Sequence, residues 1–567
     1  MVARQVTPKE WYLAAEAAEK AGNLYDATKL LDLGLAEHPS SADLANSAGS
    51  LALRRNEAKS ASSHFKKAAE LQPDNLDFKL NLAISLTEIP NYEAALALLH
   101  EIEQRARHWA RYWSIRANAE RSSGRLSAAS TSYEQCLSLD DAHVRALHGR
   151  ARVALERGEP LASQYFDHAL ARNQGDADLW LGKAQALSAE GDYAGARHVV
   201  EQIVSAAPAF LEGLRFLAQL RLAAGEREFA QHFHMAATTA PNDQNIPKIH
   251  AYLLASADRP SEAAEISHAA RMRFPDQPAF ALAEASYASA AGQTLRAEGI
   301  FAELQLDTVD RFVLECRHRL RQRDFDRANL LASQALTHAP DDVSAWALQG
   351  LVWRLVGDER AYWMHEQPAL VQTRALEGRS TLLDRVSEAL NALHDRSSFP
   401  LAQSLRGGTQ TPHILFARCE PVFAELHDVI VHTLRSYRSA LPPSDEIHPL
   451  LRYRDKPWRL GGSWSVRLNG GGDHHASHIH PQGIISSALY IQLPEASSRN
   501  NKEACLEIGR PPPDLNLELG PLTTIAPEVG ELALFPSTLY HGTTPFSEGS
   551  RMSVAFDIIS SRQPRDD

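Results

Sequence analysis

Residues 61–73 read ASSHFKKAAELQP, and the same order of small, large and small residues before a proline recurs along the chain. Ala61 and Ala68 are the small residues, Phe65 is the large apolar one, and Pro73 closes the motif. A proline ends a helix because it has no amide hydrogen to donate and clashes with the preceding turn. The motif therefore predicts helices that end at regular intervals. The other prolines in this position are Pro39, Pro208, Pro241, Pro275 and Pro340.

The spacing of these motifs, 34 residues from the first proline to the second and 33 or 34 for most others, resembles that of the tetratricopeptide repeat (TPR). Gly49 is expected at a point where two helices pack closely. We expect about ten repeats over residues 8–341, within a domain spanning residues 1–342, and a half-repeat at Trp346–Gly357. The resemblance implies an all-α superhelix whose concave groove binds peptides or partner proteins. An irregular helical bundle is the alternative.

The composition is that of an ordinary soluble protein, with 44% hydrophobic and 23% charged residues among 567. The net charge of −12 disfavours nucleic acid as a partner. No run approaches the ~18 apolar residues of a membrane span, so no membrane partner is expected. The four cysteines are far apart, without a CxxC pair, which favours a reducing compartment. We expect a cytoplasmic protein; its oligomeric state is not indicated.

The character of the sequence changes after about residue 357. Residues 343–445 are expected to form a helical half-repeat, a connector and supporting helices, because LLDRVSEALNALHD and PVFAELHDVIVHTLRSYRSAL have apolar residues at helical spacing. From Trp458 onward, short β-type runs alternate with glycine and proline. This pattern predicts an all-β sandwich or barrel over residues 446–567.

Four histidines occur in the stretch DHHASHIHPQ, residues 473–482. If SHIHP ends a strand, His478 and His480 share one face and Ile479 lies on the other. Two imidazoles on one face can share a metal ion. A third ligand must then come from elsewhere in the sheet, and His541 is the best candidate, where ELALFPSTLY runs into a polar turn.

Arg551 begins the apolar run RMSVAFD and is expected to share a strand face with Ser553. An inward arginine in a barrel needs an anion, because an unpaired buried charge is very costly. A guanidinium with a neighbouring hydroxyl suits the distal carboxylate of a dicarboxylic acid.

These segments resemble the 2-oxoglutarate/Fe(II)-dependent dioxygenases, and more narrowly the oxygenase domains that follow TPR arrays. The resemblance rests on GSWSVRL, HIHPQGIISSALYIQLP and ELALFPSTLYHGTTPF…RMSVAFD, with lead-in segments WRLVGDERAYWMHEQPALV and SLRGGTQT. It implies a double-stranded β-helix (jelly roll) for residues 446–567 and two cofactors, Fe(II) and 2-oxoglutarate. It makes His478 and His541 iron ligands, Arg551 and Ser553 the carboxylate clamp, and Tyr490 a further contact of the cosubstrate.

His480 stands where the wider superfamily has an aspartate or glutamate. The usual set of two histidines and one carboxylate leaves positions open for cosubstrate and oxygen. A third neutral imidazole leaves the site one negative charge short. His480 is expected to be a ligand; the alternative is that it lies behind the ligands and His475 or Asp473 coordinates instead. No catalytic side chain beyond the metal ligands is expected.

The expected activity is hydroxylation of a protein or peptide side chain presented by the TPR groove. One alternative is a non-catalytic adaptor whose β domain senses metal or 2-oxoglutarate. Another is a three-histidine dioxygenase that needs no 2-oxoglutarate. The stretches 495–503 and 511–516 are interpreted as loops at the barrel mouth that could cover the substrate.

Overall fold

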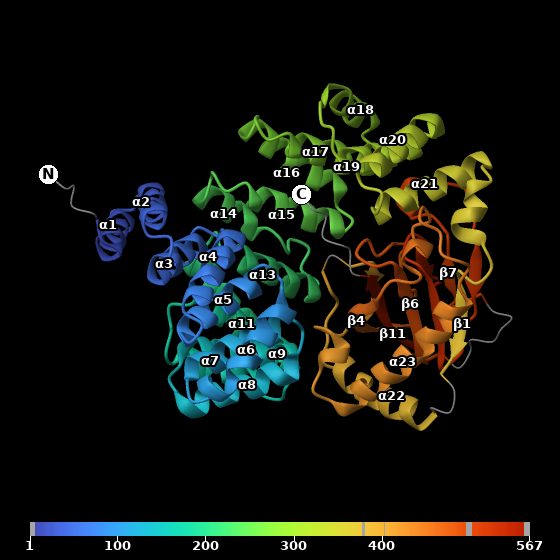
Figure 1. The fold of residues 1–567 in the computed structure, drawn as a ribbon. Coiled ribbons are helices and arrows are strands. Elements are labelled where there is room, and N and C mark those ends of the chain that lie inside the picture. The colour runs from blue at the N-terminus through green and yellow to red at the C-terminus, as the bar shows by residue number, and fades with distance from the viewer. Residues whose placement is uncertain (1–5, 377–379, 402, 495–501, 561–567) are drawn as a thin grey trace. The chain divides into compact units, whose positions relative to one another are not determined.

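The computed structural model describes residues 6–376, 380–401, 403–494 and 502–560 (Figure 1). The chain divides into two compact units, Met1–Ala186 and Leu187–Asp567. The first unit contains only helical repeats among its described residues. The second unit contains the later repeats and a β domain.

The first unit is a series of antiparallel helical pairs. Its helices are α1 (Pro8–Lys20), α2 (Leu24–Glu37), α3 (Ala42–Arg54), α4 (Ala58–Leu71), α5 (Leu76–Glu88), α6 (Tyr92–Ala106), α7 (Ala110–Ser122), α8 (Leu126–Leu139), α9 (Val144–Glu156), α10 (Ala162–Leu170) and most of α11 (Ala177–Glu190).

The small and large positions of the sequence motif form the contacts between helices. Ala61, Phe65 and Ala68 on α4 are all at most 1% exposed. Gly49 on α3 faces Phe65 so closely that a Cβ atom there would lie 2.7 Å from the ring. The small residues therefore recur because neighbouring helices cross at short distance.

The second unit continues the array with α12 (Tyr193–Ala206), α13 (Leu211–Ala223), α14 (His232–Thr239), α15 (Asn245–Ser256), α16 (Pro260–Arg273), α17 (Pro278–Ala290), α18 (Thr294–Glu303), α19 (Val309–Arg321), α20 (Phe325–His338) and α21 (Val343–Val356). Each of the six motif prolines follows the end of a helix, as Pro73 follows Leu71 and Pro340 follows His338. The helix α21 ends at Gly357, which adopts φ 71° at the C-cap, a conformation that favours glycine.

A connector follows the array. It contains the π-helix η1 (Tyr362–Glu366), the strands β1 (Gln372–Ala375), β2 (Leu405–Arg406) and β3 (Thr409–Gln410), the helices α22 (Ser380–His394) and α23 (Pro421–Ala440), and the 3-10 helices η2 (Leu415–Ala417) and η3 (Leu451–Tyr453).

The described strands of the β domain wind through three antiparallel sheets. The larger sheet has the order β1-β9-β6-β11-β4-β3, and the two smaller ones have the orders β10-β7-β8 and β2-β5. An isolated bridge between His478 and His541 pairs β10 with the segment that follows β5. This winding is that of a jelly roll, or double-stranded β-helix. The remaining elements are β4 (Trp458–Asn469), β5 (His474–His475), β6 (Ile485–Gln492), β7 (Leu506–Ile508), η4 (Pro513–Leu515), β8 (Thr523–Ile525), β9 (Glu531–Pro536), β10 (His541–Thr543) and β11 (Ser550–Ser560).

One face of the larger sheet packs against α22 and α23, which lie beside the strands in Figure 1. Met552, Val554 and Phe556 on β11 belong to this apolar core. Arg551 and Ser553, the alternate residues, face the other way and line a cavity inside the β domain. The prediction of an all-α array followed by a β domain is confirmed.

The β domain contacts the last repeats through η4. Asp514 accepts hydrogen bonds from Arg317 (2.7 Å) and Arg321 (2.5 Å) on α19. Burial opposes ionisation of Asp514, but the two guanidinium groups outweigh it and lower its pKa. The segment 511–516 thus packs against the array, and none of its residues is among those lining the cavity. Residues 495–501 of the other suggested cover lie outside the described residues.

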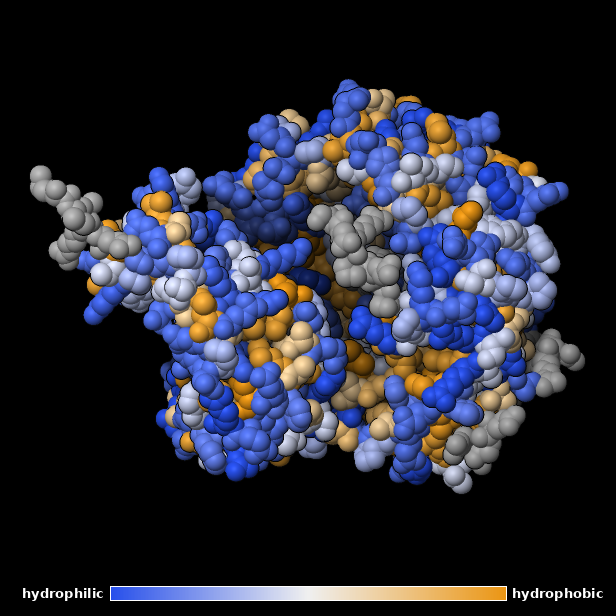
Figure 2. All heavy atoms as spheres, in the orientation of Figure 1, coloured by the Kyte–Doolittle hydropathy of each residue, from blue (hydrophilic) through white to orange (hydrophobic). Residues whose placement is uncertain are grey.

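Polar side chains predominate on the face of the molecule shown in Figure 2, with apolar ones in smaller groups between them. Among the helices that the structure describes, none is long and apolar enough to cross a membrane.

Candidate metal centre

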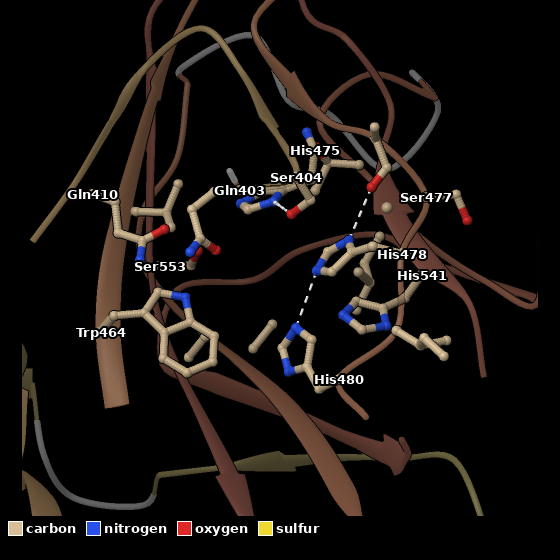
Figure 3. A pocket seen from close by; sticks show the side chains of 18 of the residues that line it. Gln403, Ser404, Gln410, Trp464, His475, Ser477, His478, His480, His541 and Ser553 are labelled. Atoms are coloured by element: carbon tan, nitrogen blue, oxygen red, sulfur yellow. Dashed lines mark hydrogen bonds between the residues drawn. The ribbon is translucent and has the colours of Figure 1, made fainter. Parts of the chain in front are cut away.

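Three imidazole rings converge inside the β domain. One ligand nitrogen from each of His478, His480 and His541 lies within 4.8 Å of the others. The ring centroids are 4.3 Å apart for His478 and His541, 4.9 Å for His480 and His541, and 5.0 Å for His478 and His480. Figure 3 shows the three rings gathered at one side of the cavity.

A backbone bridge places the first and last of these histidines side by side. The His478 amide donates to the His541 carbonyl (3.0 Å), and the His541 amide donates back (2.9 Å). The strand predicted to include SHIHP is shorter than expected, because β5 covers only His474–His475 and His478 pairs in isolation. Ile479 packs against the apolar cluster of the last repeats and also lines the cavity beside the histidines.

The second nitrogen of each ring has a fixed acceptor. The Nδ1 atoms of His478 and His541 lie 2.9 Å from the Ala476 carbonyl and 3.1 Å from the Leu539 carbonyl, and Nδ1 of His480 lies 2.5 Å from a carboxylate oxygen of Asp557. A neutral imidazole that donates through Nδ1 has a lone pair on Nε2. The Nε2 atoms of His478 and His480 are only 3.0 Å apart. Converging lone pairs repel each other unless a cation lies between them, so this arrangement fits a bound metal ion.

Burial keeps the rings of His478 and His541 neutral. It lowers the pKa of His478 to about 3, with His480 adding to the effect. The pKa of His541 is held well below its usual value by burial and then by His478. Neutral histidines are the form that binds metal.

Arg551 is 2% exposed and lines the same cavity. Within the described part of the chain its Nε has no hydrogen-bond partner, and neither does the hydroxyl of Tyr490. The guanidinium carbon of Arg551 lies 5.2 Å from the centroid of the Tyr490 ring. Tyr490 pairs with Ser553 in the register of β6 and β11. Burial raises the pKa of Tyr490 to about 12 and lowers that of Arg551. An unpaired buried charge is costly, so the surroundings of Arg551 suit an anionic ligand.

His475 and Asp473, the alternative ligands, lie outside the cluster. Nδ1 of His475 is 3.1 Å from the Ser404 hydroxyl, and its ring stacks beside His478 at 5.6 Å. The carboxylate of Asp473 accepts from the Asn469 amide (2.9 Å) within the turn that follows β4.

Sequence reasoning did not identify Asp557. The sequence does indicate that Asp557 faces the cavity, because residues 551, 553, 555 and 557 lie on the same face of one strand. An acidic residue inside an apolar run is also unusual. All four line the cavity, and Asp557 is the one acidic side chain among its described lining residues.

The cavity has a volume of about 790 Å³, and the three histidines line part of it. Gln403 and Gln410 lie across the cavity from His478 and His541 in Figure 3, and the Trp464 ring lies 5.4 Å from that of His480. Tyr252, from helix α15 of the repeats, also lines it. Arg406 lines the cavity too, but its charge is paired with Asp258 at 2.9 Å.

Family models match both parts of the chain. Residues 462–557 match the model described as "Putative 2OG-Fe(II) oxygenase". Three tetratricopeptide repeat models match residues 52–119 and 161–220, residues 314–358, and residues 110–143. The chain therefore combines TPRs with a C-terminal domain similar to the putative 2OG-Fe(II) oxygenases.

Individual relatives cover only parts of the chain. Cellulose synthase operon protein C of Komagataeibacter sucrofermentans is 32% identical over 78 residues, which are 14% of this chain and 6% of that protein. A tetratricopeptide repeat protein from Parabacteroides merdae is 19% identical with a TM-score of 0.36, over 43% of this chain and 97% of that one. PilF of Pseudomonas aeruginosa is 21% identical with a TM-score of 0.33, over 37% of this chain and 96% of that one.

Proposed function

We propose that this chain, in which tetratricopeptide repeats precede a domain similar to the putative 2OG-Fe(II) oxygenases, is a 2-oxoglutarate- and Fe(II)-dependent hydroxylase of protein or peptide side chains. One observation carries the proposal: three imidazole lone pairs and an unpaired buried guanidinium share one cavity. The three imidazoles suit a divalent metal ion, and the guanidinium suits the far carboxylate of a dicarboxylic acid.

In this proposal His478, His480 and His541 hold Fe(II), and Arg551 with Ser553 binds the distal carboxylate of 2-oxoglutarate. With both groups bound, the centre supplies oxidative decarboxylation: one atom of O₂ enters succinate, CO₂ leaves, and the other atom converts a substrate C–H bond to C–OH. The protein's own residues fix the orientation of the cosubstrate. The apolar packing around Arg551 and Tyr490 keeps water away from the carboxylate pair and so strengthens it.

The repeats contribute directly to the cavity, which supports a substrate delivered by them. Tyr252 is 50% exposed on α15 and lines the cavity together with the histidines. A volume of about 790 Å³ is larger than a five-carbon dicarboxylate needs, so space is left for a side chain of a second molecule.

The test is anaerobic loading with Fe(II) followed by titration with 2-oxoglutarate, monitored by the charge-transfer absorbance of a chelated keto acid. We expect a saturable band. Arg551→Ala should weaken 2-oxoglutarate binding about 100-fold, because a buried charge-assisted contact is worth about 3 kcal/mol. Arg406→Ala is the matched control, since that arginine lines the same cavity but already has an anionic partner.

Two results would contradict the proposal. Bound Fe(II) that gives no band with 2-oxoglutarate, in a protein that forms no succinate, would favour the adaptor. Turnover that survives Arg551→Ala and needs no 2-oxoglutarate would favour a three-histidine dioxygenase.

A further inference from the structure

The third histidine of the cluster is held by a carboxylate on its outer side. Nδ1 of His480 lies 2.5 Å from Oδ1 of Asp557, and both side chains are 14% exposed. The other close polar contact of Asp557 is the Ser486 hydroxyl at 3.5 Å. The short, sheltered contact to His480 is therefore the main interaction of this carboxylate among the described residues.

The sheet is built to aim Asp557 at His480. The register between β11 and β4 shifts after Asp557, which pairs with Gly462, while Ile558 pairs with Leu460. Gly461 is thus the extra residue of a bulge, a feature that re-aims side chains next to active sites. A Cβ atom at Gly461 would lie 2.8 Å from Ile559, and one at Gly483 would lie 3.3 Å from the Cβ of Asp557. Gly461 on β4 and Gly483 in the turn before β6 leave room for this arrangement.

A set of two histidines and one carboxylate gives the metal one anionic ligand, whereas three imidazoles give none. A carboxylate that accepts the Nδ1–H of a histidine ligand fixes the ring and makes its other nitrogen a stronger donor. We propose that Asp557 is a positioning residue that orients His480 and supplies, one imidazole ring away, the negative charge that the three-histidine set lacks.

This inference rests on the metal site of the proposed function but not on its reaction, so it is tested with Co(II) alone. Co(II) is titrated into the metal-free full-length chain, with calorimetry for affinity and visible absorption for the ligand field. We expect Asp557→Asn to weaken Co(II) binding about 10–100-fold and to shift the absorption bands, with one ion still bound per chain. Asp395→Asn, which removes the exposed partner of Arg467, is the matched control and should change neither.

A double-mutant comparison separates positioning from a general structural role. In a His480→Ala background, Asp557→Asn should have little further effect, because the ring through which it acts is gone. An equal loss of Co(II) affinity in both backgrounds would overturn the proposal, as would wild-type affinity and spectrum in Asp557→Asn.

A relocated charge provides an independent test if Asp557→Asn alone folds poorly. His480→Asp places a carboxylate directly beside the metal, so the charge of Asp557 is no longer needed. The double variant His480→Asp/Asp557→Asn should bind Co(II) within about threefold of the wild type. Failure of this folded double variant to bind Co(II), when His480→Asp alone binds it, would overturn the inference and leave the assignment of the three histidines intact.

Discussion

Tyr490 presents its ring to Arg551 while its hydroxyl lacks a partner inside the described domain. A buried hydroxyl without a hydrogen bond is costly, so its persistence indicates a partner that binds. We expect Tyr490→Phe to weaken 2-oxoglutarate binding about 5–10-fold and to leave Co(II) binding unchanged. Without ligand, the variant should be as stable as the wild type or more so. Thermal unfolding with and without 2-oxoglutarate measures both effects; a destabilised ligand-free variant would contradict the prediction.

His394 is a buried histidine away from the cluster. It bonds to the hydroxyls of Thr409 (2.9 Å) and Ser465 (3.0 Å), and burial lowers its pKa to about 3, with Arg467 adding to the effect. Because this pKa lies below the unfolded value of about 6.5, the unfolded chain takes up the proton first as the pH falls. The stabilisation is therefore complete above about pH 6.5 and declines toward about pH 3.

We expect this residue alone to cost the β domain about 2 kcal/mol between about pH 7.5 and about pH 5. His394→Gln should have a lower free energy of unfolding than the wild type at neutral pH. That free energy should fall less than in the wild type when the pH is lowered. Urea unfolding at the two pH values, monitored by tryptophan fluorescence, gives the difference. An unchanged pH dependence in the variant would show that His394 is not the group responsible.

Among the elements, the helical pairs depend on close approach at particular glycines. A Cβ atom at Gly149 on α9 would lie 2.1 Å from the Tyr133 ring of α8, whereas one at Gly299 on α18 would meet no atom within 4 Å. We expect Gly149→Ala to destabilise the array by about 1–3 kcal/mol through overpacking. Gly299→Ala should stabilise it by about 0.5–1 kcal/mol, because alanine is the better helix former. Thermal unfolding of both variants checks the opposite signs.

Elements also show where sequence reasoning succeeds. The positions of Ala61, Phe65 and Ala68 could be predicted because many repeats display the same geometry with different residues. The alternation that turns Arg551 and Ser553 inward could be predicted because β11 is one uninterrupted strand from Ser550 to Ser560. The extent of strand β5 could not be predicted, because it forms few backbone hydrogen bonds. The bridge at His478 depends on His541, a partner far along the chain.

The same limit applies to the site. Nothing local to Asp557 indicates that it meets His480, since that contact depends on the register shift opposite Gly461. Tyr252 could not be assigned to the cavity, because its own repeat gives no sign of which domain lies beside it. Contacts set by tertiary register or by the docking of separate segments are therefore the part that sequence patterns do not contain.

At the scale of the whole molecule, the β domain and the last repeats share an ion-pair cluster. Asp514 is paired with Arg317 and Arg321, which are 25% and 12% exposed. We expect Asp514→Ala to cost about 1–3 kcal/mol, because two sheltered guanidinium groups lose their partner. Glu518→Ala removes the exposed pair with Arg323 and should cost almost nothing. Hydrogen exchange in α19 and residues 510–520 should rise in the first variant alone; equal rises in both would contradict the prediction.

Leu515 and Tyr540 of the β domain belong to the same apolar cluster as Phe312 and Leu348 of the repeats. A gene fragment cut between α21 and the connector would leave these side chains bare on both products. Such fragments should aggregate and express poorly. The oxygenase-like region could therefore not be transferred between unrelated repeat arrays by itself. Domain shuffling during evolution would have to transfer helices α19–α21 together with the β domain.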